Sequence, residues 1–212
     1  MLVAFDFDGT LSDSEMTVLL GEQVGVAPEM AEITERAMNN ELAYAESLRR
    51  RCALLSGLDL ARATGAFEGV TLRPGAADVL DALAGAGVET AILTGGFERG
   101  VEAALARAGT DVDTVVANRL PAADGALTGD VEGPLVEGTK DDALGVLRAA
   151  TGETETVAVG DGANDLPMLE AADLAVGFAP KPAVEPSCEA VVDSMGELRA
   201  VFEAEGILPE SA

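Results

Sequence analysis

Leu2-Val3-Ala4-Phe5-Asp6-Phe7-Asp8-Gly9-Thr10 is the stretch that decides the fold. Its first four residues are apolar, which predicts a short buried strand, and acids follow that strand at once. Much later, Thr156-Val157-Ala158-Val159 leads in the same way into Gly160-Asp161-Gly162-Ala163-Asn164-Asp165. In an open parallel sheet, ligands bind outside the carboxyl ends of the strands. We therefore expect both stretches to direct their acids into one crevice.

Converging carboxylates repel one another unless a cation lies between them, and a small cluster of oxygen ligands suits Mg²⁺. Mg²⁺ is usually held by one or two carboxylates together with a substrate phosphate. One acid of the pair Asp6 and Asp8 can attack phosphorus, and the other can protonate the leaving oxygen. The pattern thus predicts Mg²⁺-assisted phosphoryl transfer. The alternative for the pair alone is a solvated strand end.

Three further features fit such a site. Thr94-Gly95-Gly96 follows an expected strand, and a hydroxyl with bare backbone N–H groups at a helix start can cradle an anion. Lys140 begins an expected helix and can neutralise a transferring phosphoryl group. In the later acidic turn, one acid can complete the Mg²⁺ shell, Asn164 can donate to phosphate and Asp165 can hold Lys140. Taken singly, an ordinary turn and a solvated lysine remain the alternatives.

Composition excludes several classes of partner. The chain has 212 residues, of which 48% are hydrophobic, and a net charge of -25. Such a charge repels nucleic acid and anionic membranes. No apolar run is long enough to span a bilayer, and no signal segment is evident, so we expect a soluble, cytoplasmic protein. Because salt screens repulsion between surface acids, we also expect the protein to work in a salt-rich cytoplasm.

Alternating strand-like and helical patterns indicate an α/β fold with a Rossmann-like parallel sheet flanked by helices. The expected strands are Leu2–Phe5, Val88–Leu93, Thr114–Ala117, Thr156–Val159 and Leu174–Val176. The expected helices of this part are Ala76–Ala84, Arg99–Ala108, Lys140–Ala150 and Leu166–Ala171. Residues 119–131 predict a hairpin with Asp124-Gly125 as its turn.

Residues 14–72 break the alternation, since they carry helical patterns without a strand. The expected helices are Glu15–Val24, Met30–Met38, Leu42–Leu55 and Leu60–Phe67. We interpret residues 14–72 as an all-helical cap inserted into an α/β core of residues 1–13 and 73–212. A cap at this point overhangs the crevice, where a lid excludes water and selects substrate. In the cap, Glu15 and Arg49-Arg50-Arg51 offer the anion and cation that an amino acid would need; helix-end charge and a solvated face are the alternatives.

The order Asp6-x-Asp8, Thr94, Lys140 and Asp161…Asp165 resembles the four motifs of the haloacid dehalogenase superfamily of phosphatases. Within it, the likeness to the phosphoserine phosphatases runs almost end to end. That likeness includes Glu15, Ser47-Leu48-Arg49-Arg50-Arg51, Ala117-Asn118-Arg119-Leu120 and Leu127-Thr128-Gly129-Asp130-Val131-Glu132-Gly133. Gly9 and Thr94 differ from the Ser that this family often has at both positions.

The resemblance implies a role for each matching residue. Asp6 matches the nucleophile that becomes phosphorylated, and Asp8 matches the general acid and base. Asp6, Asp8 (through its carbonyl) and Asp161 match the Mg²⁺ ligands. The phosphate-binding groups match Thr94, Gly95, Lys140 and Asn164. Glu15 and Arg51 match the residues that hold the amine and carboxylate of the substrate, and Asp165 matches the residue that steadies the lysine.

The activity that the resemblance implies is hydrolysis of O-phosphoserine to serine and phosphate through an aspartyl-phosphate, the last step of serine biosynthesis. The nearest alternative is the same chemistry on another small phosphate ester, such as phosphoglycolate or phosphohomoserine. More distant from this expectation are a phosphomutase, an inactive binding protein and a phospho-accepting receiver domain. In receiver domains, however, the acceptor usually ends a middle strand, and here the acids end the first.

Overall fold

A single parallel sheet organises the computed structural model, which describes residues 1–38 and 41–210. Six strands of the described chain lie in the order β3-β2-β1-β6-β7-β8, and every neighbouring pair is parallel. They are β1 (Leu2–Phe5), β2 (Glu89–Phe97), β3 (Thr114–Asn118), β6 (Thr156–Gly160), β7 (Leu174–Phe178) and β8 (Ala190–Val192). The expected Rossmann-like α/β architecture is confirmed.

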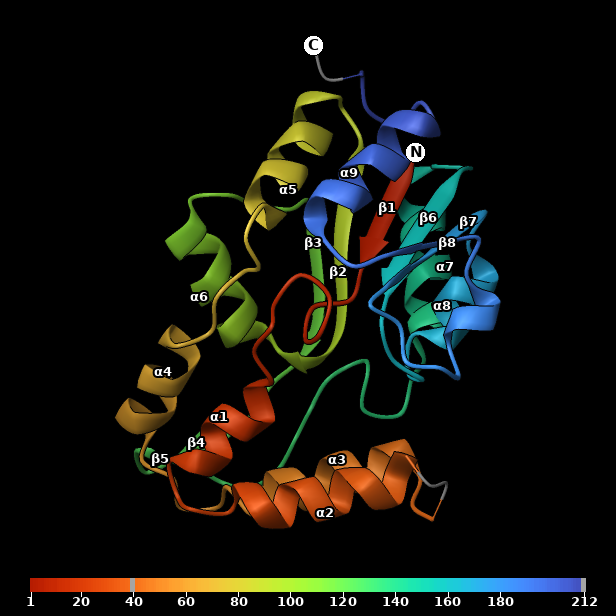
Figure 1. Ribbon diagram of the computed structural model, residues 1–212. Coiled ribbons are helices and arrows are strands. Elements are labelled where there is room, and N and C mark those ends of the chain that lie inside the picture. Colours follow the sequence, from red (N-terminus) through yellow and green to blue (C-terminus); the bar gives the residue numbers. More distant parts are fainter. Residues whose placement is uncertain (39–40, 211–212) are drawn as a thin grey trace.

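Both faces of the sheet are buried because side chains alternate along each strand. In β1, Val3 and Phe5 join one apolar cluster, whereas Leu2 and Ala4 join another. The first cluster lies under α5 (Ala76–Gly85), α6 (Glu98–Ala108) and α9 (Met195–Ala204), and the second under α7 (Lys140–Thr151) and α8 (Leu166–Ala171). Figure 1 shows the two groups of helices on opposite sides of the strands.

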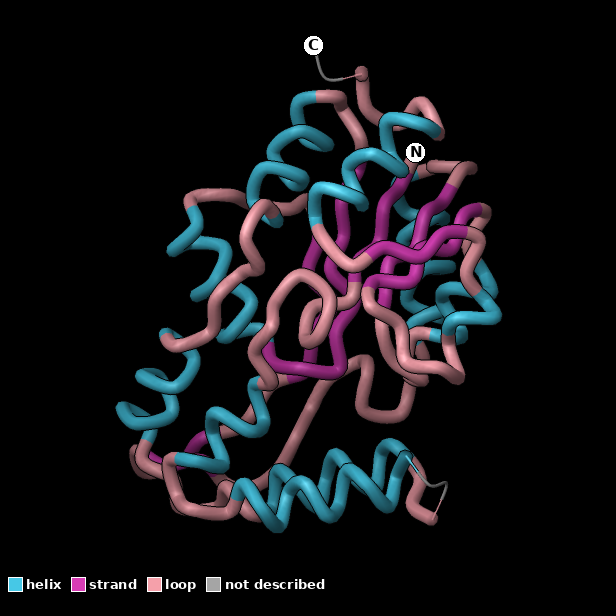
Figure 2. The backbone as a smooth tube through the Cα atoms, viewed as in Figure 1, coloured by secondary structure: helices cyan, strands magenta, loops and turns pink. Residues whose placement is uncertain are grey.

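Between β1 and α5, the described residues form helices and no strand. The helices are α1 (Met16–Glu22), α2 (Ala27–Met38), α3 (Tyr44–Ala53) and α4 (Leu60–Glu68). They lie beyond the end of the sheet to which the β1 arrow points (Figures 1 and 2). Their apolar residues Leu20, Met30 and Leu48 belong to the same buried cluster as Phe5. The division into a core and a cap at residues 14 and 72 stays a prediction.

The hairpin consists of β4 (Ala122–Ala123) and β5 (Ala126–Leu127). Its turn residues Asp124 and Gly125 both have positive φ, 52° and 81°, which is the backbone that a two-residue hairpin turn requires. The hairpin packs on the helical segment, because Leu127 N donates to Leu58 O and Leu60 N donates to Gly125 O. Residues far apart in the chain thus secure the start of α4.

Four features differ from the sequence expectation. Strand β8 and helix α9 were not expected, and a short 3₁₀ helix, Glu185–Ser187, precedes β8. Strand β2 also continues past Leu93 to Phe97, with a shift in its pairing to β3 between those two residues. Thr94-Gly95-Gly96 therefore lies inside an irregular strand end rather than at the start of α6. The expected placement at a helix start was wrong, whereas the expected anion binding by this stretch stays a prediction. No helix of the described residues is long and apolar enough to cross a membrane.

Candidate active site

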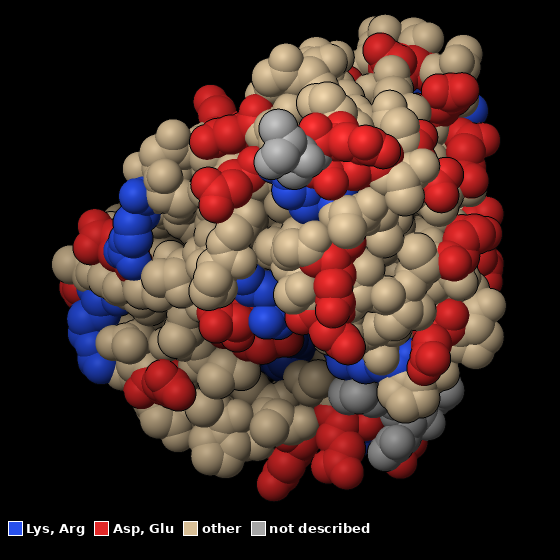
Figure 3. Space-filling model, turned by 45° about the horizontal axis from the view of Figure 1, so that its top comes forward, with Lys and Arg blue, Asp and Glu red and all other residues tan. Residues whose placement is uncertain are grey.

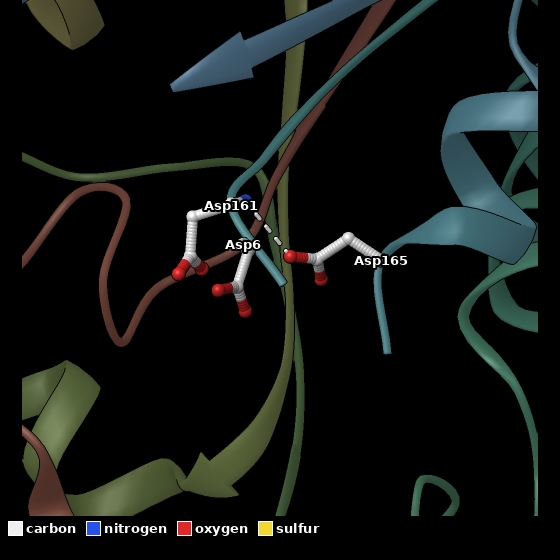
Figure 4. A group of neighbouring side chains, drawn as sticks. All are labelled: Asp6, Asp161 and Asp165. Carbon is white, nitrogen blue, oxygen red and sulfur yellow. Dashed lines mark hydrogen bonds between the residues drawn. The ribbon is translucent and has the colours of Figure 1, made fainter. Parts of the chain in front are cut away.

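Asp6 and Asp161 lie side by side because their strands are neighbours. Phe5 of β1 is paired with Val159 of β6, and Asp6 N donates to Val159 O over 2.8 Å. Together with Asp165, these residues offer carboxylate oxygens that all lie within 4.8 Å of one another. In the described part of the chain this is the one group of three acidic, histidine or cysteine side chains so arranged. Figure 4 shows the three carboxyl groups gathered at the strand ends.

Lys140 provides the countercharge within this group. Its Nζ donates to Asp6 Oδ1 and to Asp165 Oδ1, both at 2.5 Å, and its side chain is only 4% exposed. Lys140 begins α7, so the sequence placed it at the correct point of a helix, but it is buried rather than solvated. A buried ammonium between two carboxylates compensates charges that would otherwise be costly to bury.

Asp165 is already saturated by protein donors. Its Oδ1 accepts from Lys140, and its Oδ2 accepts from the backbone N–H groups of Asp161 and Gly162, at 3.0 and 2.8 Å. The dashed line in Figure 4 marks the first of these backbone bonds. Asp165 thus ties the acidic turn to Lys140, while Asp6 and Asp161 each keep an oxygen that no hydrogen bond among the described residues engages.

Asp8 lies close to Asp6 but outside the group of three. Its Oδ1 is buried and has no hydrogen-bond partner among the described residues, which makes it available to a ligand. Its Oδ2 lies so near Gly96 that a Cβ placed there would be 2.9 Å away. A buried carboxylate oxygen without a donor favours the protonated acid. Asp8 is therefore placed to hold a proton beside Asp6.

The pKa values of both acids are raised. Burial and then the charge of Asp165 raise the pKa of Asp6 from 3.8 to about 8, although Lys140 lowers it. Burial, followed by the charges of Glu15 and Asp6, raises the pKa of Asp8 well above its usual range. Strongly shifted acids that share a site are typical of functional centres. A divalent cation bound here would favour the ionised form of the acid it contacts.

The irregular end of β2 lines the same region. Thr94 is buried, and its hydroxyl accepts from Gly96 N at 2.9 Å, so this N–H is engaged within the strand end. Gly95 O accepts from Asn118 Nδ2 at 3.0 Å. A Cβ on Gly95 would lie 1.8 Å from the Tyr44 hydroxyl, so only glycine fits under that side chain. Tyr44 therefore brings the helical segment onto the strand end.

The acidic turn after β6 leaves little room for larger residues. Asn164 Nδ2 is 3.5 Å from Asp165 Oδ1, which directs its amide toward the carboxyl group. Gly9 has φ +94°, and a Cβ there would lie 2.8 Å from the carboxyl atoms of Asp161. The Gly at this position therefore lets the first acidic turn approach the second.

Glu15 and Arg51 come from the helical segment. Glu15 directly precedes α1; the residue is exposed, but partial burial of its carboxylate raises its pKa, whereas Lys181 and Arg51 lower it. Arg51 Nη1 donates to Thr17 Oγ1 at 3.3 Å, and within the described structure its buried Nε has no hydrogen-bond partner. Of its neighbours, Arg49 pairs with Glu137 and Arg50 pairs with Glu46 on the surface. Only the third arginine of the run thus has a buried donor to spare.

Two residues of the site were missed from the sequence. Lys181 Nζ lies 3.2 Å from Asp161 Oδ2, and Tyr44 lies against Gly95. Each is rare in this chain, since there are two lysines and one tyrosine, and that rarity was the available signal. Figure 3 shows acids spread over one face of the molecule, with basic side chains meeting them in a hollow.

Comparisons with known proteins agree with this geometry. The haloacid dehalogenase-like hydrolase family matches residues 3–170. A phosphoserine phosphatase of Halobacterium salinarum is 55% identical over 208 residues, which are 97% of this chain and 99% of that protein. A phosphoserine phosphatase of Methanocaldococcus jannaschii is 35% identical over 95% of both chains.

Solved structures of phosphoserine phosphatases are similar to this chain in fold. One, described as a phospho-aspartyl intermediate analogue of phosphoserine phosphatase, superposes with a TM-score of 0.86 at 34% identity, covering 96% of this chain and 97% of its own. Another, a substrate-bound phosphoserine phosphatase complex, has a TM-score of 0.86 at 33% identity with the same coverage. The fold is thus shared with these structures along nearly the whole chain.

Proposed function

This chain belongs to the haloacid dehalogenase-like hydrolases, and on that premise we propose that it hydrolyses O-phosphoserine to serine and phosphate. The observation that carries the proposal is the meeting of Asp6, Asp161 and Asp165 around Lys140 at the carboxyl ends of adjacent strands. The identity of 55% with a phosphoserine phosphatase over nearly all of both chains supports the substrate.

The donor set fits Mg²⁺. Asp6 and Asp161 each have a carboxylate oxygen to offer, and the backbone carbonyl of Asp8 completes the set that the family resemblance assigns. Mg²⁺ prefers such oxygen ligands and keeps positions for substrate phosphate. When bound, it neutralises charge on the phosphoryl oxygens and keeps an acid ionised.

The reaction divides between Asp6 and Asp8. Asp6 attacks phosphorus in line and forms an aspartyl-phosphate, which splits one difficult step into two. Asp8, whose burial raises its pKa and so favours the protonated acid, gives its proton to the serine oxygen as that oxygen leaves. Asp8 then takes a proton from the water that hydrolyses the aspartyl-phosphate, which restores both acids.

Charge and position are supplied by the surrounding residues. Phosphoryl transfer depends mainly on positioning and on stabilising charge. Lys140, fixed by Asp165, brings its ammonium beside Asp6, where the phosphoryl group would be transferred. We assign phosphate binding to Thr94, Gly95 and Asn164, as the family resemblance implies; of these, Asn164 lies beside Asp165, with Nδ2 3.5 Å from Oδ1. The helical segment approaches the site through Tyr44, whose hydroxyl lies against Gly95.

Glu15 and Arg51 are the side chains that favour an amino-acid phosphate as the substrate. The unpartnered Arg51 Nε suits the carboxylate of an amino acid, and the Glu15 carboxylate suits its ammonium. A phosphorylated amino acid carries both groups, whereas phosphoglycolate lacks the amine. A cytoplasmic location, as expected from the sequence, is part of this proposal.

The direct test is phosphate release from O-phosphoserine at high salt, with Mg²⁺ and with a chelator. We expect Mg²⁺-dependent turnover that is faster for O-phosphoserine than for phosphohomoserine or phosphoglycolate. Faster phosphate release from another ester would change the proposed substrate but would leave the proposed phosphatase chemistry in place. A stable phosphoprotein without phosphate release would instead favour a receiver-type domain.

A further inference from the structure

Lys181 is the second lysine of the chain, and it lies at the same site as the first. It belongs to the loop after β7, and it contacts Asp161 twice. Its backbone N donates to Asp161 O at 2.9 Å, and its Nζ lies 3.2 Å from Asp161 Oδ2. Val184 N donates to Lys181 O at 2.8 Å, which fixes the loop from its other side. The backbone bonds therefore hold the loop beside Asp161, and the contact with Oδ2 holds the ammonium.

The two lysines contact Asp6 and Asp161 in the same way, each through one carboxylate oxygen. Lys140 engages Asp6 through Oδ1, and Lys181 engages Asp161 through Oδ2. In the described structure, no hydrogen bond engages the remaining oxygen of either acid. Each acid can therefore give one oxygen to a cation while a lysine keeps the other. The Asp161 side chain is 14% exposed and that of Lys181 is 49% exposed, so this second contact is open to solvent on the lysine side.

Binding through one oxygen or two distinguishes divalent cations. Mg²⁺ is small and demands near-ideal octahedral geometry, whereas Ca²⁺ takes six to eight oxygens and often binds both oxygens of a carboxylate. An ammonium on Oδ2 therefore penalises a cation that needs both oxygens of Asp161. Resting on the proposed function, we propose that Lys181 is a positioning residue that limits Asp161 to one-oxygen binding and so selects Mg²⁺ over Ca²⁺.

The charge of Lys181 does not by itself explain such selection. Mg²⁺ and Ca²⁺ carry the same charge, and the Coulomb repulsion from an ammonium at a given distance is the same for both. Removing the charge should strengthen the binding of both cations by a similar factor. The ratio of the two affinities therefore isolates the effect on the carboxylate from the effect of charge.

The experiment measures binding of MgCl₂ and of CaCl₂ to the metal-free full chain by calorimetry at high salt, without substrate. Lys181→Met removes the contact, and Lys181→Ala is a second truncation in case the first perturbs folding, which circular dichroism monitors. Lys181→Arg keeps a cationic donor. Arg148→Met is the matched control for charge, because Arg148 Nη2 donates to Thr154 O, and Thr154 precedes the end of β6 opposite to Asp161.

We expect the affinity for Ca²⁺ relative to Mg²⁺ to rise about tenfold in Lys181→Met and Lys181→Ala, a change of the size that outer-shell partners of a metal ligand exert on affinity. Lys181→Arg and Arg148→Met should keep the wild-type ratio. Equal strengthening of both cations, or no change, would overturn the proposal and leave the proposed hydrolysis intact. If the wild type binds neither cation, or binds both but does not release phosphate from O-phosphoserine, the proposed function itself fails.

Discussion

Replacing Lys140 by Met tests whether the buried charge group is as tightly coupled as its geometry indicates. Lys140 donates to Asp6 and Asp165 at 2.5 Å, and the Asp165 side chain is fully buried. Burial alone would lower the pKa of Lys140, but the charges of Asp165 and Asp6 outweigh it and raise the pKa above 10.5. A raised lysine pKa means that this stabilisation is complete below pH 10.5 and is lost only as the pH rises through the folded value.

The size of the effect follows from the loss of a buried partner. Breaking a buried ion pair by removing one side costs about 3–5 kcal/mol, because an uncompensated charge stays buried. For a chain of this length, 1 kcal/mol shifts the melting temperature by about 2–4 °C. We therefore expect Lys140→Met to melt about 6–20 °C below the wild type at neutral pH. High salt should change this difference little, because buried pairs are screened much less than surface pairs.

Calorimetric or circular-dichroism melting of the metal-free proteins measures the shift. Arg50→Met is the matched control, since Arg50 pairs with Glu46 at 2.8 Å but both side chains are nearly half exposed. An exposed pair on one helix is worth about 0.3–0.5 kcal/mol, so this variant should melt within about 2 °C of the wild type. Lys140→Met/Asp165→Asn should recover part of the loss, because it removes the stranded charge. If Lys140→Met melted as the Arg50 control does, the coupling inferred from the short contacts would be refuted.

Further predictions concern catalysis, pH and salt. Asp6→Asn should reduce phosphate release to background while leaving the circular-dichroism spectrum unchanged; retained turnover would exclude Asp6 as nucleophile. Arg51→Ala should lower kcat/KM for O-phosphoserine about 10- to 100-fold, as expected for a lost charged hydrogen bond, and should spare an aryl phosphate; equal losses would show that Arg51 does not bind the carboxylate. Without metal, Asp6 in the folded protein has a pKa raised to about 8, whereas in the unfolded chain its pKa is 3.8. The contribution of Asp6 to the free energy of unfolding therefore falls as the pH rises between these two values. Mg²⁺ binding near neutral pH should therefore release protons, seen by calorimetry in buffers of different ionisation enthalpy; binding without proton release would contradict the raised pKa. Dialysis to low salt should unfold the protein, given its net charge of -25, and full stability there would count against a salt-rich working environment.

The parts of the fold that could be predicted are those fixed by local pattern. The apolar runs Leu2–Phe5 and Thr156–Val159 are strands, and the acids that follow them meet because those strands are hydrogen-bonded neighbours. The start of α7 at Lys140 also followed from sequence. In each case the residues that decide the structure are adjacent in the chain, so that periodicity and turn chemistry suffice.

The missed parts depend on how distant segments close on one another. β2 could not be expected to run on to Phe97, because Gly95 and Gly96 are typical of a turn and their place is set by Tyr44 and Asp8. Lys181 follows a strand that was expected, but its contact with Asp161 arises from a loop between β7 and β8, and β8 was not foreseen. Contacts between segments that are distant in the sequence leave no periodic pattern and no fixed residue spacing from which to predict them.

The charges of this chain fall into two classes that salt affects differently. Its 38 acids outnumber its 13 basic residues, so a substrate that carries phosphate meets a repulsive surface. At 1 M salt the Debye length is about 3 Å, which screens most of that repulsion. Lys140, at 4% exposure between Asp6 and Asp165, is beyond the reach of this screening. Salt therefore removes the barrier to an approaching anion while it leaves intact the buried charges around Asp6, to which we assign the binding of the phosphate.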